Sequence, residues 1–204
     1  VAAALGIRTT FLGQGRLPQR PITAYLRELP KKGITFAYAN TMPFTIEGEL
    51  QPGVYELEGD VSSQYVTGLI LALILLPGDS EIRMLSRLES KPYVDLTIAC
   101  LRQFGAEVQE TASGYRIPGG QKLHACDQTV EGDYSQAAFF SVANVLGSTI
   151  ELTNLNPKSV QGDKKIVEIT EQMCYNLKEG LPACISVDAS DIPDLGPILA
   201  VLAT

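Results

Sequence analysis

The pattern of apolar positions predicts a buried helix near the middle of the first half of the chain. Residues 65–76 form the longest apolar run and contain Thr67 and Gly68. A run of about a dozen residues is too short to cross a membrane as a helix, which takes about 20. We therefore expect a core helix over this segment.

A second helix is predicted over residues 92–104. Its apolar side chains Tyr93, Leu96, Cys100 and Leu101 recur at roughly the spacing of one helical face. That face is expected to be buried. Four further aromatic residues lie on apolar faces and are interpreted as core, namely Tyr25, Phe36, Phe139 and Phe140.

Short strands are predicted between the helices. Residues 107–110 and 115–118 flank Ser113-Gly114, which is a hairpin signal. Residues 44–48 and 54–57 flank Pro52-Gly53, and we expect them to pair in the same way.

An internal repeat organises these elements. Residues 57–64, a helix and residues 78–85 recur about 70 residues later as 130–136, a helix and 147–152. Residues 20–22 and 33–36, on either side of a helix, match residues 91–93 and 105–108. The repeat predicts α/β units of strand, buried helix, strand, a second helix begun near a proline, and two short strands.

The repeat also suggests where the chain divides. The polar, glycine-led stretch 119–128 separates the copies, so a domain boundary is expected near Gln128. After Met173 the pattern is compressed, because residues 174–177 stand where the repeat predicts a strand; Met173-Cys174 is either a true bond or a gap. The chain opens at Val1 without Met and stops within an apolar helical pattern. We interpret it as an internal piece of a longer protein.

Charge and cysteine content narrow the function classes. The 204 residues contain 16 Lys and Arg against 23 Asp and Glu, a formal net charge of −7. Nucleic acids and anionic membranes attract basic surfaces, so neither is expected as a partner. The only histidine, His124, is interpreted as a surface residue near a connection. Four cysteines lie far apart and indicate free thiols in a reducing cytoplasm rather than a metal site, namely Cys100, Cys126, Cys174 and Cys184.

One candidate functional site is a phosphate-binding site at the start of the predicted buried helix. Residues 59–64, Gly-Asp-Val-Ser-Ser-Gln, lie between a predicted strand and the buried helix. The free backbone N–H groups and the hydroxyls of Ser62 and Ser63 would there meet the positive end of the helix dipole. The alternative is an ordinary helix cap. The second copy, beginning at Asp133, fits a motif that simply starts helices.

Other candidates lie at turns that precede helices. Arg16 and Arg20 stand on a proline-stiffened turn, where guanidinium groups suit a phosphate or carboxylate ligand or are plain surface arginines. Ser90, Lys91 and Tyr93 stand at the entrance of the helix over 92–104. Carboxylates at a later turn are either general bases or caps, namely Asp188, Asp191 and Asp194.

Taken in their order along the chain, six segments resemble those of the EPSP synthase family, the 3-phosphoshikimate 1-carboxyvinyltransferases. The similarity spans nearly the whole chain but corresponds to about the middle half of the usual family sequence. It is carried by Gly15-Arg16-Leu17-Pro18-Gln19-Arg20-Pro21, Val61-Ser62-Ser63-Gln64, Ser90-Lys91-Pro92-Tyr93-Val94-Asp95, Glu131-Gly132-Asp133, Ser159-Val160-Gln161-Gly162-Asp163 and Ile192-Pro193-Asp194.

The resemblance implies a fold of two domains, each an inside-out α/β barrel of three βαβαββ units around buried helices, here incomplete. Residues 1–128 would form most of the domain that binds shikimate 3-phosphate. Residues 129–204 would form the first part of the second domain, with the active site in the cleft between the two.

The resemblance also implies the reaction. The family transfers the enolpyruvyl group of phosphoenolpyruvate to the 5-hydroxyl of shikimate 3-phosphate and releases phosphate, with neither metal nor organic cofactor. Site residues follow by position. Ser62, Ser63 and Ser90 match those that hold the phosphate of shikimate 3-phosphate, and Tyr93 lines the shikimate site. Gln64 contacts both substrates, Arg20 with Arg16 binds phosphoenolpyruvate, and Asp194 contacts shikimate and accepts a proton.

Several family segments are missing from these residues, among them an early Lys-Ser segment and a C-terminal lysine of the phosphoenolpyruvate site. The resemblance therefore predicts that this piece is inactive without the remaining half of the enzyme. Two alternatives stay open. One is UDP-N-acetylglucosamine enolpyruvyl transferase, which shares the fold but typically uses a loop cysteine; the Ser-Ser-Gln segment favours shikimate 3-phosphate. The other is a non-catalytic repeat domain that only binds.

Overall fold

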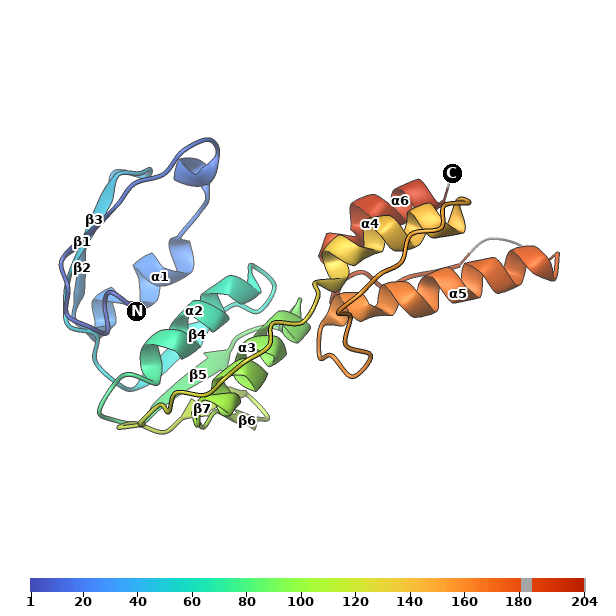
Figure 1. Ribbon diagram of the computed structural model, residues 1–204. Coiled ribbons are helices and arrows are strands. Elements are labelled where there is room, and N and C mark those ends of the chain that lie inside the picture. Colours follow the sequence, from blue (N-terminus) through green and yellow to red (C-terminus); the bar gives the residue numbers. More distant parts are fainter. Residues whose placement is uncertain (181–184, 204) are drawn as a thin grey trace. The chain divides into compact units, whose positions relative to one another are not determined.

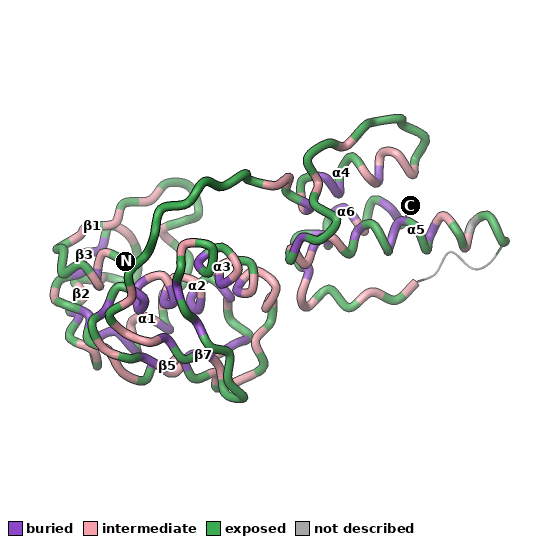
Figure 2. Tube along the Cα trace, turned by 60° about the horizontal axis from the view of Figure 1, so that its bottom comes forward, coloured by how far each residue is buried: buried purple, intermediate pink, exposed green. Residues whose placement is uncertain are grey.

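The structure is a computed structural model that describes residues 1–180 and 185–203 (Figure 1). The chain forms two compact units. The first consists of Val1–Glu89 and Cys100–Cys126, and the second of Ser90–Ala99 and Asp127–Thr204. The stretch 122–130, which contains His124, is exposed throughout and appears green in Figure 2. His124 is thus a surface residue, as predicted, whereas Cys184 lies outside the described residues.

Residues 54–117 form one complete copy of the predicted βαβαββ repeat, in which residues 90–99 belong to the second unit and the others to the first. Its four strands form a sheet in the order β4-β5-β7-β6, in which β4 and β5 are parallel and the other pairs are antiparallel. In chain order the elements are β4 (Val54–Leu57), α2 (Ser63–Leu73), β5 (Ser80–Met84), α3 (Lys91–Gln103), β6 (Gln109–Thr111) and β7 (Gly114–Ile117).

A second, three-stranded sheet repeats the last part of that arrangement. Its order is β1-β3-β2 and all its pairs are antiparallel, as for β5-β7-β6. Its elements are β1 (Thr9–Phe11), the short turn η1 (Leu17–Gln19), α1 (Thr23–Glu28), η2 (Pro30–Lys32), β2 (Ile34–Ala37) and β3 (Phe44–Gly48). The predicted match of residues 20–22 and 33–36 with residues 91–93 and 105–108 is therefore confirmed.

The two copies end their second helix in the same way. Gly33 and Gly105 adopt φ angles of +89° and +83°, a left-handed conformation in which a side chain is strained. The next residue then returns a hydrogen bond to the helix end, from Ile34 N–H to the Leu29 carbonyl at 3.1 Å and from Ala106 N–H to the Leu101 carbonyl at 3.0 Å. A matching glycine thus turns the chain into the following strand in both copies.

The core of the first unit lies between α2 and the four-stranded sheet. Alternating residues of the strands are buried, among them Tyr55, Ile82 and Ile117, each 0% exposed. Along α2, Val66, Ile70 and Leu73 are likewise 0% exposed. Full burial of such a side chain stabilises the fold by about 1.5–3 kcal/mol. The predicted buried helix is confirmed, with bounds of Ser63–Leu73.

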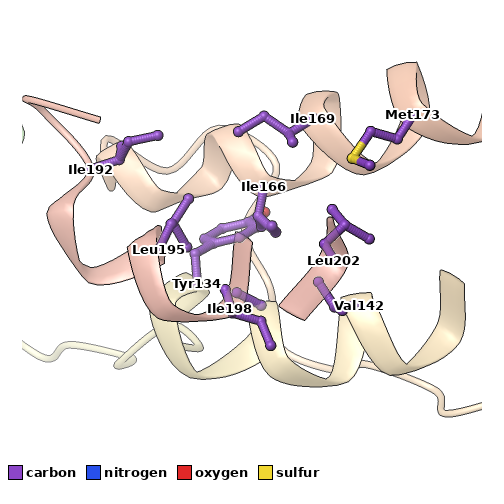
Figure 3. Packing of buried hydrophobic residues seen from close by; sticks show 10 residues of the cluster. Tyr134, Val142, Ile166, Ile169, Met173, Ile192, Leu195, Ile198 and Leu202 are labelled. Carbon is purple, nitrogen blue, oxygen red and sulfur yellow. The ribbon is translucent and has the colours of Figure 1, made fainter. Parts of the chain in front are cut away.

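The second unit is built from helices. It contains α4 (Tyr134–Val145), η3 (Gly162–Lys164), α5 (Lys165–Lys178), η4 (Pro193–Leu195) and α6 (Gly196–Leu202). Figure 3 shows the apolar cluster that joins α4, α5 and α6, in which Ile166, Ile192 and Leu195 are 0% exposed. This cluster anchors the short turns η3 and η4 between the helices.

One predicted strand pairing is wrong. β3 pairs with β1 and β2, whereas β4 pairs in parallel with β5, with Val54 opposite Glu81. The backbone between β3 and β4 is bonded elsewhere, because Leu50 N–H donates to the Ala3 carbonyl and Gln51 N–H to the Lys32 carbonyl. The hairpin between β6 and β7 is confirmed.

The buried face of the helix over 92–104 is also corrected. Leu101 is buried as predicted and Tyr93 is half-buried, whereas Leu96 and Cys100 are exposed. Val94 and Ile98 are buried with Leu101, because their spacing of four and three residues places these three side chains on one face of the helix. Tyr25 and Phe36 are half-buried. Phe139 and Phe140, predicted as core, are 48% and 49% exposed.

The second copy of the repeat departs from the prediction. No strand occurs among the described residues of the second unit, residues 90–99, 127–180 and 185–203. At the expected strand 147–152, the side chain of Asn144 takes up both backbone groups of Ile150, so no neighbouring strand pairs there. Residues 174–177, where the repeat predicts a strand, continue α5.

Candidate functional site

The loop that leads into α2 is held by close backbone contact. A Cβ atom on Gly59 would lie 2.5 Å from the Arg87 carbonyl oxygen, so only glycine fits. The Gly59 carbonyl accepts a hydrogen bond from Glu89 N–H at 3.0 Å, and its N–H donates to Ser86 Oγ at 2.8 Å. Ser86 Oγ in turn donates to Asp60 at 2.8 Å. The residues before Ser62 are therefore fixed.

Ser62 is the cap of α2 and Ser63 is its first residue. The backbone of Ser62 is extended, and its Oγ accepts a hydrogen bond from Gln64 N–H at 3.3 Å. Ser63 is 9% exposed, while the side chain of Gln64 is exposed. The start of this 11-residue helix combines two hydroxyls with the positive end of the helix dipole. Such an end suits an anion such as phosphate.

Arg16 and Arg20 flank the short turn η1, which belongs to the same unit as Ser62. Arg16 precedes η1 and Arg20 follows it, and both are exposed. Within the described residues neither forms a salt bridge. Pro21, which follows Arg20, accepts a hydrogen bond from the hydroxyl of Tyr65 in the first turns of α2. The Arg20 segment and the start of α2 are therefore tied together.

Ser90 stands at the start of α3 in an unusual conformation. Its φ angle is +55°, and its N–H donates to the Ser190 carbonyl at 3.0 Å. The Ser190 Oγ and Asp191 Oδ1 atoms nearby are buried and have no hydrogen-bond partner among the described residues. The turn over 188–191 thus holds the backbone of Ser90 in place.

A cavity of about 370 Å³ lies in the second unit, which includes Ser90–Ala99. Of the predicted site residues, the structure brings Tyr93 and Asp194 together here. The wall is rich in acidic and polar side chains; its residues are Pro92, Tyr93, Leu96, Val130, Glu131, Asp133, Ser135, Gln161, Asp163 and Asp194.

Asp194 is presented to solvent by two buried neighbours. Ile192 and Leu195 are both 0% exposed in the core cluster, while Pro193 and Asp194 on η4 are exposed. The turn is therefore anchored on either side of Asp194, which lines the cavity and interacts with the hydroxyl of Tyr93. Asp188 and Asp191 do not line the cavity.

A hydrogen-bond network around Glu131 and Gln161 builds part of the cavity wall. Glu131 accepts hydrogen bonds from Ser159 Oγ, from Gln161 Nε2 at 2.8 Å and from Asn156 Nδ2 at 2.8 Å. These bonds, that of Ser159 first, lower the pKa of Glu131 below its usual range. Gln161 Oε1 also accepts from Tyr134 N–H at 2.8 Å, at the start of α4. The motif that begins at Glu131 and the motif that begins at Ser159 are thus joined by hydrogen bonds.

Asp133 acts as the cap of α4. Its Oδ1 accepts from Ser135 N–H at 2.8 Å and from Gln136 N–H at 3.4 Å. The second copy of the motif therefore starts a helix, as the capping interpretation predicted.

The residue that the sequence reasoning missed is Asp163. It belongs to one of the motifs but was given no role. Tyr93 Oη donates to Asp163 Oδ2 at 3.1 Å. Burial, followed by the charges of Asp163 and Asp194, raises the pKa of Tyr93 above its usual range, and burial raises the pKa of Asp163. The signal lay in the motif, but the contact joins residues 70 positions apart.

The described residues contain no group of three or more His, Cys, Asp or Glu side chains arranged to hold a metal ion. Within the same residues, no helix is long and apolar enough to span a bilayer. Cys100, Cys126 and Cys174 form no disulfide among the described residues.

Comparison with known proteins places the chain in a family. The family model for EPSP synthase (3-phosphoshikimate 1-carboxyvinyltransferase) matches residues 1–204. The 3-phosphoshikimate 1-carboxyvinyltransferase of Clostridium novyi is 43% identical over 95% of this chain, and that of Clostridium kluyveri is 41% identical over 100% of it. The matches cover 47% and 50% of those proteins, so the chain spans about half of their length.

A solved structure shares the fold. The EPSP synthase from Acinetobacter baumannii matches 84% of this chain and 38% of its own, with a TM-score of 0.66 and 24% sequence identity. This likeness confirms the fold class predicted from the repeat. With the family model matching from the first residue to the last, the chain belongs to the EPSP synthase family.

Proposed function

We propose that the chain is the part of an enolpyruvyl transferase that binds shikimate 3-phosphate and contributes to the phosphoenolpyruvate site. The complete enzyme would move the enolpyruvyl group of phosphoenolpyruvate to the 5-hydroxyl of shikimate 3-phosphate and release phosphate, in the synthesis of aromatic amino acids. The observation that carries the proposal is the start of α2, where Ser62 and Ser63 offer an anion site within a chain that matches this family throughout.

The roles of the side chains follow from their positions. Ser62, Ser63 and Ser90 would hold the phosphate of shikimate 3-phosphate, and Tyr93 would line the site of its ring. Gln64, exposed beside Ser63, would contact both substrates. Arg20, with Arg16, would bind phosphoenolpyruvate, and their exposure without a carboxylate partner among the described residues supports this role.

Asp194 would contact the shikimate hydroxyls and accept a proton. In the reaction the 5-hydroxyl oxygen bonds to C2 of phosphoenolpyruvate while C3 takes up a proton, which gives a tetrahedral intermediate; phosphate then leaves C2 as C3 loses a proton, which restores the double bond. The attacking hydroxyl must lose its proton, and an exposed carboxylate on an anchored turn is suited to take it. Local cations and helix N-termini favour the approach of two anions, even though the chain carries a net charge of −7.

The working environment and partners are part of the proposal. We infer a division between the two family domains near residue 128 and a requirement for the remaining half of the enzyme. Cys100, Cys126 and Cys174 form no disulfide among the described residues, which suits a reducing cytoplasm.

Activity is tested in a chimera. Residues 1–204 replace the matching segment of the Clostridium novyi relative, and phosphate release is measured with phosphoenolpyruvate and shikimate 3-phosphate. We expect turnover by the chimera, none by the 204-residue chain alone, and loss of turnover with Asp194→Asn. UDP-N-acetylglucosamine serves as the competing acceptor. A folded chimera that releases phosphate only with that acceptor, or with neither, contradicts the proposal.

A further inference from the structure

The turn that carries Asp163 approaches the start of α3 unusually closely. A Cβ atom on Gly162 would lie 2.8 Å from the side chain of Pro92 and 3.1 Å from the Asp191 carbonyl oxygen. The glycine therefore allows η3 to press against the first turn of α3. Asp163, the next residue, is only 3% exposed and reaches Tyr93.

The hydrogen bond between the two side chains has a defined direction. An ionised carboxylate only accepts hydrogen bonds, and a phenol has one proton to give. Burial and the charges of Asp163 and Asp194 raise the pKa of Tyr93, so its hydroxyl keeps that proton near neutral pH. Asp194 also interacts with this hydroxyl, but the hydrogen bond of 3.1 Å directs the proton to Asp163, and the phenolic oxygen retains lone pairs for other contacts.

The negative charge around Tyr93 limits which ligand groups can donate a hydrogen bond to its phenolic oxygen. Glu131, Asp133 and Asp194 line the same cavity as Tyr93 and Asp163. Carboxylates at this density disfavour the phosphate or carboxylate of a ligand and favour a neutral hydrogen-bond donor. A ring hydroxyl is neutral, which suits a cavity lined by carboxylates, and it can donate a hydrogen bond to the phenolic oxygen of Tyr93.

We propose that Asp163 is a positioning residue: it takes the only hydroxyl proton of Tyr93, so that Tyr93 meets the ligand as an acceptor and selects a ring hydroxyl that donates. This inference rests on the proposed function, since the ligand is taken to be shikimate 3-phosphate. It assigns Asp163 an effect on ligand choice in addition to the packing of η3.

The first test needs no ligand. The Tyr93 side chain is labelled with ¹³C at Cζ, assigned with Tyr93→Phe, and titrated by NMR in the 204-residue chain. Removing the Asp163 charge with Asp163→Asn should lower the pKa of Tyr93 by about one unit or more. The matched control is Asp133→Asn, which removes a charge from the same cavity while asparagine still caps α4. A Tyr93 pKa that is unchanged by Asp163→Asn in a folded chain overturns the inference.

The second test measures ligand choice by calorimetry. Shikimate 3-phosphate is compared with analogues in which fluorine, which cannot donate, replaces the 4- or the 5-hydroxyl. The wild-type chain should bind one analogue about tenfold more weakly, the equivalent of about 1.4 kcal/mol. Tyr93→Phe should abolish this preference and Asp163→Asn should reduce it.

The outcomes of these tests distinguish the positioning role of Asp163 from the proposed binding of shikimate 3-phosphate. A preference that survives Asp163→Asn unchanged overturns the inference while leaving the proposed function intact. A wild-type chain that binds no shikimate 3-phosphate contradicts the proposed function instead. In that case the NMR titration alone decides whether Asp163 controls the proton of Tyr93.

Discussion

The hydroxyl of Tyr65 donates a hydrogen bond to the backbone carbonyl of Pro21, 44 residues earlier in the sequence. The hydroxyl of Tyr25 completes the link by donating to the Tyr65 carbonyl at 3.0 Å. The two rings also meet edge to face, with centroids 4.9 Å apart. The start of α2 and the segment that carries Arg20 are therefore one structural unit.

Tyr65→Phe tests this link. The substitution keeps the buried ring and removes one hydrogen bond, so the free energy of unfolding should fall by about 1 kcal/mol. Urea unfolding of the 204-residue chain measures the change. Tyr175→Phe is the matched control, since that side chain is 58% exposed and the same substitution there should have little effect. Equal effects of the two substitutions would show that the Pro21 contact adds no stability.

Substitutions at Ser62 separate capping from phosphate binding. Ser62→Ala removes the cap of α2 and should cost about 1 kcal/mol of stability. Ser62→Asp keeps a good cap but places a negative charge at the anion site. We expect Ser62→Asp to unfold like the wild type and to lose affinity for shikimate 3-phosphate. Normal affinity in Ser62→Asp would place the phosphate elsewhere.

Gly59→Ala tests the close contact beneath the same loop. The added methyl group would lie 2.5 Å from the Arg87 carbonyl and 2.7 Å from Leu88 Cα, both of them backbone atoms. Overpacking of this kind costs about 1–3 kcal/mol, which thermal or urea unfolding would detect. At Gly196 no atom outside its chain neighbours and its own helix backbone lies within 4 Å of the added position, so Gly196→Ala should cost less than Gly59→Ala. A neutral Gly59→Ala would contradict the described loop.

The stability of the first unit should depend on pH through Glu28. Burial alone would raise the pKa of this carboxyl, but Lys31, the N–H of Glu56 and Arg27 outweigh burial and lower it. A lowered pKa stabilises the fold above the ordinary value of 4.5, and this contribution disappears as the pH falls through the lowered pKa.

Glu28→Gln should therefore cost about 2 kcal/mol at pH 7, and the cost should shrink as the pH falls below 4.5. Urea unfolding across this pH range gives the comparison. Glu47→Gln is the control, because Glu47 and its partner Arg8 are 66% and 74% exposed and such pairs add little. A cost that stays constant with pH would exclude the ionised Glu28 as its source.

Local sequence patterns predicted the elements that depend on local interactions. The apolar run over 65–76 predicted α2, and Ser113-Gly114 predicted the hairpin of β6 and β7. The pairing of β4 was missed because its partner, β5, follows only after the whole of α2. The strand at 147–152 was wrong because a strand needs a neighbour, and Asn144 binds the backbone of Ile150 instead.

Local sequence patterns were limited in the same way in predicting the candidate site. Ser62 and Asp133 were recognisable as the start of helices because capping acts over two or three residues. The roles of Tyr65 and Asp163 depend on contacts with Pro21 and Tyr93, which are 44 and 70 positions away. No local pattern specifies such contacts. The sequence motif marked the place of Asp163 without indicating its partner.

A calorimetric titration of the 204-residue chain with shikimate 3-phosphate tests the central claim most directly, with shikimate and inorganic phosphate as comparison ligands. The anion site at the start of α2 predicts that shikimate 3-phosphate binds, that shikimate binds much more weakly, and that Ser62→Asp abolishes the difference. A folded chain that binds shikimate as tightly as its 3-phosphate, or that binds neither, would contradict the assignment of this site.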